Sequence, residues 1–174
     1  ALDAPMLMLV SNKSLLGKIN FPRESLIMAG AGEVLFNFGI SLLMIIVAFL
    51  FFQYIPTWHI LLAPLGGFAL LFYGLTIGLI LTPFGMLYQD IGSALKIITQ
   101  FLFYITPIAY TIPEAGISKL IMEWNPLSYL ILVTRDWLTI GETAHLVPFL
   151  IVLGLTIPLF IFSLIFYKLS MPFI

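Results

Sequence analysis

The sequence predicts an all-α membrane protein, a helical bundle of four transmembrane helices with an amphipathic cytoplasmic segment and a re-entrant helical hairpin on the outer side. The 174 residues are 61% hydrophobic and only 9% charged, with a mean hydropathy of +1.15. Soluble domains carry roughly 25% charged residues. Long apolar runs alternate with short polar turns. The charged residues are too few to cover a water-facing surface. We therefore interpret residues 1–174 as a single, partial membrane domain.

Four apolar runs have the length of a bilayer span, which is about 20 residues. Glu33 is the ionisable residue that interrupts the first of them, and Pro64 and Pro83 predict kinks or ends in the second. Small residues precede Glu33, and glycines recur in the second run, which favours close helix packing. The runs cover residues 26–52, 60–87, 94–112 and 146–167, and the glycines are Gly66, Gly67, Gly74 and Gly78.

Residues 113–145 form a polar zone that predicts a re-entrant or interfacial hairpin. Trp124-Asn125-Pro126 divides the zone into two short helices, at about 116–123 and 126–140. The second helix is too short to span the bilayer with charged residues inside it. Its backbone is tolerated at membrane depth only where protein or water covers it. Because adjacent charges pair poorly, Arg135 and Asp136 are each expected to pair elsewhere. Either they form a salt bridge that holds the hairpin, or they act as a gate or sugar contact.

Residues 11–25 are the best-defined polar segment. Ser11 and Asn12 are expected to cap a short amphipathic helix that begins at Lys13 and lies at the membrane interface. Phe21-Pro22 ends that helix, because the residue before a proline is pushed out of the helical region. Pro22 also suits the first turn of the following span, where its missing N–H costs nothing.

The distribution of basic residues predicts which side faces the cytoplasm. With four spans, residues 1–25, 88–96 and 168–174 share one side of the membrane. That side carries Lys13, Lys18, Arg23, Lys96 and Lys168, and the other side carries Lys119 and Arg135. Five basic residues against two predict that the first side is cytoplasmic.

The residue types present argue against several chemistries. His59 and His145 fall at span ends on the outer side, with no serine or aspartate at catalytic spacing. The sequence has no cysteine, no paired carboxylates for a metal and no P-loop. No basic tract is available for nucleic acid. We therefore expect no catalytic residue, no metal, no cofactor in this chain and no nucleic-acid partner.

A few polar and aromatic residues remain as functional candidates. Glu33 either faces a bundle interior or water path, or snorkels to the membrane surface. Asp90 either caps the next helix or contacts a cytoplasmic partner. Six aromatic residues are expected to face either a substrate passage or lipid. They are Tyr73, Tyr88, Phe101, Phe103, Tyr104 and Tyr110.

Four segments, in this order, resemble the ABC-2-type permeases that export polysaccharides. They are Asn12 with Leu15-Leu16-Gly17-Lys18-Ile19-Asn20-Phe21-Pro22-Arg23-Glu24, Tyr88-Gln89-Asp90-Ile91, Tyr104-Ile105-Thr106-Pro107-Ile108-Ala109-Tyr110, and Trp124-Asn125-Pro126-Leu127 followed by Arg135. The resemblance covers the whole chain but only the carboxy-terminal part of the family's protein. It implies six spans in an intact member, so the first two spans are expected to be absent here.

The resemblance implies a non-enzymatic transporter of the bacterial cytoplasmic (inner) membrane. Two permease chains in the lipid bilayer would bind two copies of a separate ABC ATPase, and ATP and Mg would bind to that partner. The substrate would be a lipid-linked polysaccharide of the O-antigen, capsule or teichoic acid type. Three alternatives remain: an ABC-2 permease for a drug or small hydrophobic molecule, a membrane-embedded enzyme acting on lipid or glycan, and a small structural or channel-like membrane subunit.

The resemblance also implies roles for particular residues. Residues 11–25 would form a cytoplasmic coupling helix, and residues 113–145 an outer gate. The coupling residues would be Lys18, Asn20, Phe21, Pro22, Arg23, Glu24, Gln89 and Asp90, with Gln89 in place of the family's usual arginine. The substrate pathway would include Glu33, Tyr73, Tyr88, Phe101 and Tyr104, and the outer gate Asn125, Pro126 and Arg135.

Overall fold

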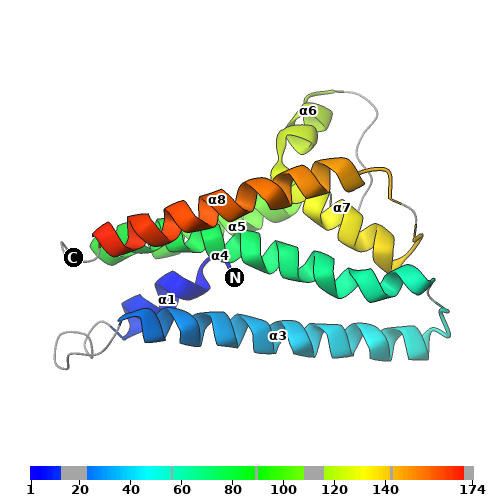
Figure 1. Cartoon of the computed structure of the whole chain (residues 1–174), viewed down its shortest axis with the longest axis horizontal. Coiled ribbons are helices and arrows are strands. Elements are labelled where there is room, and N and C mark those ends of the chain that lie inside the picture. Colours follow the sequence, from blue (N-terminus) through cyan, green and yellow to red (C-terminus); the bar gives the residue numbers. More distant parts are fainter. Residues whose placement is uncertain (13–22, 56, 89, 108–115, 142, 171–174) are drawn as a thin grey trace. The chain divides into compact units, whose positions relative to one another are not determined.

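Every regular element in the described part of the chain is a helix, which confirms the predicted all-α class (Figure 1). The computed structural model describes residues 1–12, 23–55, 57–88, 90–107, 116–141 and 143–170. The elements are α1 (Ala4–Ser11), α3 (Arg23–Phe51), the 3-10 helix η1 (Trp58–Leu62), α4 (Ala63–Leu87), α5 (Asp90–Ile105), α6 (Ile117–Trp124), α7 (Pro126–Leu138) and α8 (Leu146–Ser170).

The described residues contain three helices that are long and apolar enough to cross a membrane. They cover Ser25–Phe51, Trp58–Leu87 and Leu146–Ser170. These helices correspond to the predicted spans 26–52, 60–87 and 146–167. Pro64 is the second residue of α4, as suits the start of a helix, and Pro83 lies inside α4 four residues before its end. The structure therefore supports a multi-pass membrane protein.

The fourth predicted span, 94–112, is not confirmed. The helix in this region, α5, begins earlier, at Asp90, and ends at Ile105 after 16 residues. That length is short of the roughly 20 residues that a bilayer requires. Residues 108–115, which the prediction included, lie outside the described part of the chain.

The amino-terminal segment differs from its prediction. Ser11 is the last residue of α1 and Asn12 is its C-cap, because the apolar residues before them form a helix. Pro5 lies in the first turn of α1, where it is tolerated. Asn12 follows the helix, and its Nδ2 donates to the carbonyl of Met8 at 2.8 Å. The helix expected from Lys13 falls on residues that the structure does not describe.

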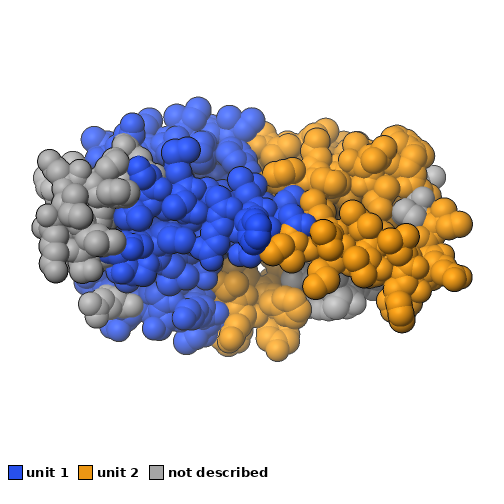
Figure 2. Space-filling model, turned by 90° about the horizontal axis from the view of Figure 1, so that it is seen from below, with its two compact units in different colours: residues 1–39, 71–97, 156–174 blue, residues 40–70, 98–155 orange. Residues whose placement is uncertain are grey.

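The chain divides into two compact units, coloured separately in Figure 2 and described here one at a time. Unit 1 comprises Ala1–Gly39, Leu71–Ile97 and Thr156–Ile174. In it, α1 packs against a glycine-bearing face of α4. A Cβ on Gly74 would contact Ala1, one on Gly78 would meet Leu2 and Pro5, and one on Gly85 would meet Met6. The predicted use of α4 glycines for close approach is thus confirmed for Gly74 and Gly78.

Unit 2 comprises Ile40–Leu70 and Ile98–Leu155. Its core is formed largely by α7, in which Leu130 and Val133 are fully buried. The Trp137 ring packs edge to face on Phe149 of α8, with 5.4 Å between ring centroids. α6 and α7 reproduce the two short helices expected at 116–123 and 126–140, since Asn125-Pro126 ends one helix and begins the next.

Candidate functional site

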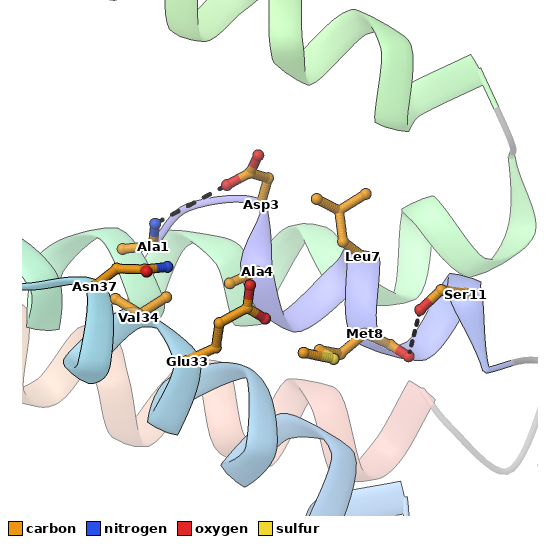
Figure 3. A pocket seen from close by; sticks show the side chains of 9 residues that line it. All are labelled: Ala1, Asp3, Ala4, Leu7, Met8, Ser11, Glu33, Val34 and Asn37. Atoms are coloured by element: carbon orange, nitrogen blue, oxygen red, sulfur yellow. Dashed lines mark hydrogen bonds and ion pairs between the residues drawn. The ribbon is translucent and has the colours of Figure 1, made fainter.

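Glu33 lines a cavity of about 420 Å³ between α1 and α3 in unit 1 (Figure 3). Its carboxylate points from α3 toward α1, and Asn37 lies one turn further along the same helix (Figure 3). Asp3, which precedes α1, contributes a second carboxylate to the lining. The remaining lining residues are Ala1, Ala4, Leu7, Met8, Ser11 and Val34.

The two carboxylates of this cavity differ in their partners. The Asp3 carboxylate forms an ion pair with the amino group of Ala1 at 3.9 Å (Figure 3), and none of the nine lining residues is lysine, arginine or histidine. A carboxylate inside a membrane span is costly unless it faces protein or water. Glu33 lines a space that also contains the polar side chains of Asp3, Ser11 and Asn37, which are the kind of neighbours that a carboxylate on a membrane span requires. The cavity can hold water or the hydroxyl and amide groups of a polar ligand.

The predicted coupling residues lie mostly beyond what the structure describes. Arg23 and Glu24 are the first two residues of α3. Asp90 is the first residue of α5 and is exposed. Its carboxylate therefore lies in the first turn, where it interacts favourably with the helix dipole, rather than capping a helix that begins near residue 94. Lys18, Asn20, Phe21, Pro22 and Gln89 fall outside the described residues.

The aromatic residues predicted for a substrate pathway are divided between the two units. Tyr73 is half-buried on α4 and Tyr88 is exposed just after it, both in unit 1. Phe101 and Tyr104 are exposed on α5 in unit 2. The contacts described within each unit do not gather all of them, with Glu33, into one site. Their role in a substrate pathway stays a prediction.

Asn125 connects two of the segments that the sequence singled out. It is the N-cap of α7, and its Oδ1 accepts a hydrogen bond from the backbone N–H of Leu127 at 3.1 Å. Its Nδ2 donates to the Thr106 hydroxyl oxygen at 3.2 Å. Thr106 and Pro107 are both buried, and Pro126 occupies the first position of α7. The Thr-Pro and Asn-Pro segments therefore meet in unit 2.

Sequence reasoning missed the part played by Thr106. Its hydroxyl donates to the carbonyl of Leu102 at 2.7 Å and accepts from Asn125. A hydroxyl that both donates and accepts a hydrogen bond has the partners that a buried polar group requires. The bond to Leu102 is local, because a threonine hydroxyl in or just after a helix can donate to the carbonyl four residues earlier. The bond between Thr106 and Asn125, nineteen residues away in the sequence, could not be predicted.

Arg135 and Asp136 contact each other, which does not exclude the other partners that the sequence analysis expects for each of them. Arg135 Nη2 lies 3.8 Å from Asp136 Oδ1, which is a loose ion pair. Burial raises the pKa of the Asp136 carboxyl, while the positive charges of Arg135 and His145 act in the opposite direction. A charged Asp136 is thus only partly compensated by its neighbours. The proposed gating role of Arg135 stays a prediction.

Comparison with known proteins gives one informative similarity. No family model matches the chain. Over 118 residues the chain is 27% identical to the O-antigen export system permease protein RfbA of Myxococcus xanthus. The match covers 66% of this chain and 45% of that relative, so the chain spans less than half the relative's length. Together with the three long apolar helices of the described residues, this similarity supports a multi-pass membrane protein.

Proposed function

We propose that this chain is part of the transmembrane subunit of an ATP-driven ABC exporter that moves a lipid-linked polysaccharide across the bacterial cytoplasmic membrane. The observation that carries the proposal is the similarity to an O-antigen export permease. The helices that can cross a membrane are consistent with it. The polymer would be of the O-antigen, capsule or teichoic acid type.

In this proposal the chain makes and breaks no bond. A separate ABC ATPase, in two copies, binds ATP and Mg and acts on two permease chains. Residues 11–25 and Asp90 receive the movement on the cytoplasmic side. The exposed carboxylate of Asp90 at the start of α5 suits a contact with a soluble partner. The chain contributes the polar surface of Glu33 on α3 to the passage.

The hairpin formed by α6 and α7 is proposed as the outer gate. Asn125 supports this role because it joins the start of α7 to Thr106 beyond the end of α5. A displacement of α5 would therefore be passed on to α7 through a hydrogen bond between buried or half-buried groups. Arg135 and Asp136 lie near the end of α7, where a gate would close on a polar glycan.

The decisive experiment deletes the full-length gene and restores it on a plasmid. The proposal expects loss of a surface polysaccharide on deletion, with intracellular build-up of its lipid-linked form, and recovery on complementation. Affinity purification of the tagged full-length protein should also recover an ATPase with Walker motifs.

Other outcomes would point to the other functions. Retained surface glycan together with increased drug sensitivity would favour a permease for small hydrophobic molecules. Conversion of a lipid-linked glycan by the purified protein with no ATPase present would instead show a membrane-embedded enzyme. Either result would contradict the proposal.

A further inference from the structure

A second cavity, of about 320 Å³, lies beside α3 in unit 2. Leu42, Ile45 and Ile46 line it from α3, and its other lining residues come from η1, the first two residues of α4 and the last residue of α7. We call this space the α3 groove. Each of its described lining residues is leucine, isoleucine, alanine or proline. Its volume lies within the range of about 300–1,000 Å³ that is typical of small-molecule sites.

The α3 groove can be reached from outside the chain. Ile46 and Leu61 line it and are 56% and 79% exposed, whereas Ala63, at the start of α4, is only 3% exposed. The lining thus ranges from a covered residue to residues that face the surroundings, as in a groove rather than a closed cavity.

Contacts within unit 2 hold the elements around the groove. The Tyr54 hydroxyl, just after α3, donates a hydrogen bond to the carbonyl of Thr139 at 2.6 Å, and Thr139 follows directly on the lining residue Leu138. A Cβ on Gly66 would overlap Thr134, so α4 packs closely on α7. The groove is therefore formed by elements that are tied to one another.

The α3 groove lies along the membrane-spanning part of the chain. Every described lining residue except Leu138 belongs to Ser25–Phe51 or Trp58–Leu87, two of the segments that are long and apolar enough to cross a membrane. Leu42 and Ile46 precede the end of α3 by nine and five residues, which places them roughly 14 and 8 Å from that end at about 1.5 Å per residue. Because the hydrocarbon core of a bilayer is about 30 Å thick, the groove is at the depth of the lipid chains.

Aromatic residues mark the level at which this end of the chain leaves the hydrocarbon. Tyr54 follows α3 and Trp58 begins η1, and both are exposed. Such residues are enriched at the membrane–water interface, which is the level of the lipid headgroups. The charge distribution predicts that this interface is the outer one. A molecule with a polar head at this level and a hydrocarbon chain beneath it is a phospholipid of the outer leaflet.

We propose that the α3 groove binds one acyl chain of a phospholipid, with the headgroup level with Tyr54 and Trp58. A hydrocarbon chain needs no hydrogen-bond partner, and the described lining side chains are all apolar. In a bilayer the affinity comes from packing rather than from the exclusion of water. A chain in the groove touches side chains of several elements at once, so it gains more dispersion contacts than a chain on the outer face of α3. The site does not depend on the proposed export function.

The test is photolabelling of the purified full-length permease in detergent. The probe is a phosphatidylethanolamine that carries a diazirine in the middle of one acyl chain, and it is titrated from below to above one molecule per permease chain. Adducts are located by tandem mass spectrometry. We expect saturable labelling of Ile45, Ile46 and residues 60–64, and weaker labelling of Leu43 and Val47, which are exposed on α3 but do not line the groove.

Two pairs of variants locate the binding. Ile46→Trp places a large side chain in the groove, and Val47→Trp places it at the next position, outside the groove. Both wild-type residues are exposed, so both variants should fold. We expect Ile46→Trp to lower the labelling of residues 60–64 by about fivefold or more and Val47→Trp to leave it unchanged. Leu42→Trp and Leu43→Trp repeat the comparison one turn earlier.

Each outcome supports or overturns the site. Labelling that follows exposure alone, with Leu43 and Val47 labelled as strongly as the groove residues, would overturn it, and so would equal labelling of the two members of each pair. Displacement of the probe by unlabelled phosphatidylethanolamine would support it. Displacement by a polyprenyl phosphate but not by phosphatidylethanolamine would assign the groove to an isoprenoid chain and overturn the phospholipid. None of these results depends on whether gene deletion removes a surface polysaccharide, so the site and the exporter can fail separately.

Discussion

The side-chain amide of Asn125 is hydrogen bonded to the hydroxyl of Thr106, with 3.2 Å between Nδ2 and Oγ1. The same amide uses its oxygen to cap α7 through Leu127 N–H. One residue thus satisfies a helix terminus and ties it to a buried Thr-Pro turn. Pro126, the first residue of α7, has no backbone N–H. The first N–H that needs a partner is therefore that of Leu127, and Asn125 supplies that partner. This arrangement explains why an asparagine precedes the proline.

A double-mutant cycle on this pair should show energetic coupling. Asn125→Ala removes both bonds of the amide and should cost about 2 kcal/mol, roughly 1 for the cap and 1 for the bond to Thr106. Thr106→Val removes the bond to Asn125 and also the bond from the Thr106 hydroxyl to the Leu102 carbonyl, and the cycle cancels the second of these because it is lost in both backgrounds. We expect a coupling energy of about 0.5–1.5 kcal/mol, measured by denaturant unfolding in mixed micelles. Strictly additive losses would show that the bond contributes nothing.

Gly66 should not tolerate a methyl group. A Cβ there would overlap Thr134 Oγ1 of α7 and lie 3.0 Å from Thr134 Cβ. Overpacking of this kind costs about 1–3 kcal/mol, so Gly66→Ala should lower the Tm of the purified protein. Gly154→Ala is the matched control, because its methyl group meets nothing within 4 Å and alanine is the better helix former. Equal Tm values for the two variants would refute close packing of α4 on α7.

Gly78 tests whether α1 is held by α4. A Cβ on Gly78 would overlap the carbonyl oxygen of Leu2 and lie 3.3 Å from Pro5 Cδ, and backbone atoms cannot rotate out of the way. We expect Gly78→Ala to increase amide hydrogen exchange in α1, measured by mass spectrometry, with a smaller effect on the rest of unit 1. Gly32→Ala on α3, where the methyl group would be in open space, serves as control. Unchanged exchange in α1 would contradict this packing.

The sequence predicted the features that depend on neighbouring residues. Three long apolar runs became long helices, and Asn125-Pro126 ended α6 and began α7 at the expected residues. Glycines at spacings of four residues, such as Gly74 and Gly78, indicated a face for close packing. Each of these signals is local, because it depends on the hydropathy, the prolines or the glycines of a single element.

Features that depend on distant contacts were not predictable. The apolar residues 6–10 are too short to span a bilayer, yet they lie in a helix, α1 (Ala4–Ser11), in which Met6 and Leu9 are buried in unit 1. Most helical stability in proteins comes from such packing. Asn12 is also the C-cap of α1, a role that the sequence analysis did not predict because asparagine is favoured at either end of a helix. Likewise, Glu33 was recognised as unusual, but its shared cavity with Asp3 required the structure.

Asp136 predicts a specific pH dependence of stability. Burial raises its pKa above the ordinary value of 3.8, so the folded state holds this proton to higher pH than the unfolded state does. Its contribution to stability is therefore present below pH 3.8 and is lost as the pH rises through the folded pKa. Asp136→Asn should remove this component, so the Tm difference between variant and wild type should move in the variant's favour as the pH rises. A difference independent of pH between 3.8 and 7 would show that Asp136 is not perturbed.

Glu33 provides the most direct link between the structure and export. Glu33→Gln keeps the size and the hydrogen-bonding atoms of the side chain but removes its charge from the cavity shared with Asp3 and Asn37. If the carboxylate contributes to the passage of a hydrated glycan, export should slow several-fold at equal amounts of permease in the membrane. The matched control is Glu123→Gln on α6, which removes an exposed carboxylate that pairs with Lys119 at 3.8 Å and does not line this cavity.

The measurement for Glu33 is the surface polysaccharide produced by a deletion strain that carries each full-length variant, normalised to the permease detected in membranes. A passage role predicts a loss with Glu33→Gln and none with Glu123→Gln, because only the first changes the charge on a membrane-spanning helix. Wild-type export by both variants would mean that Glu33 only snorkels toward the cytoplasmic surface. A loss of membrane-inserted protein in Glu33→Gln alone would instead assign the carboxylate to the packing of α3 on α1.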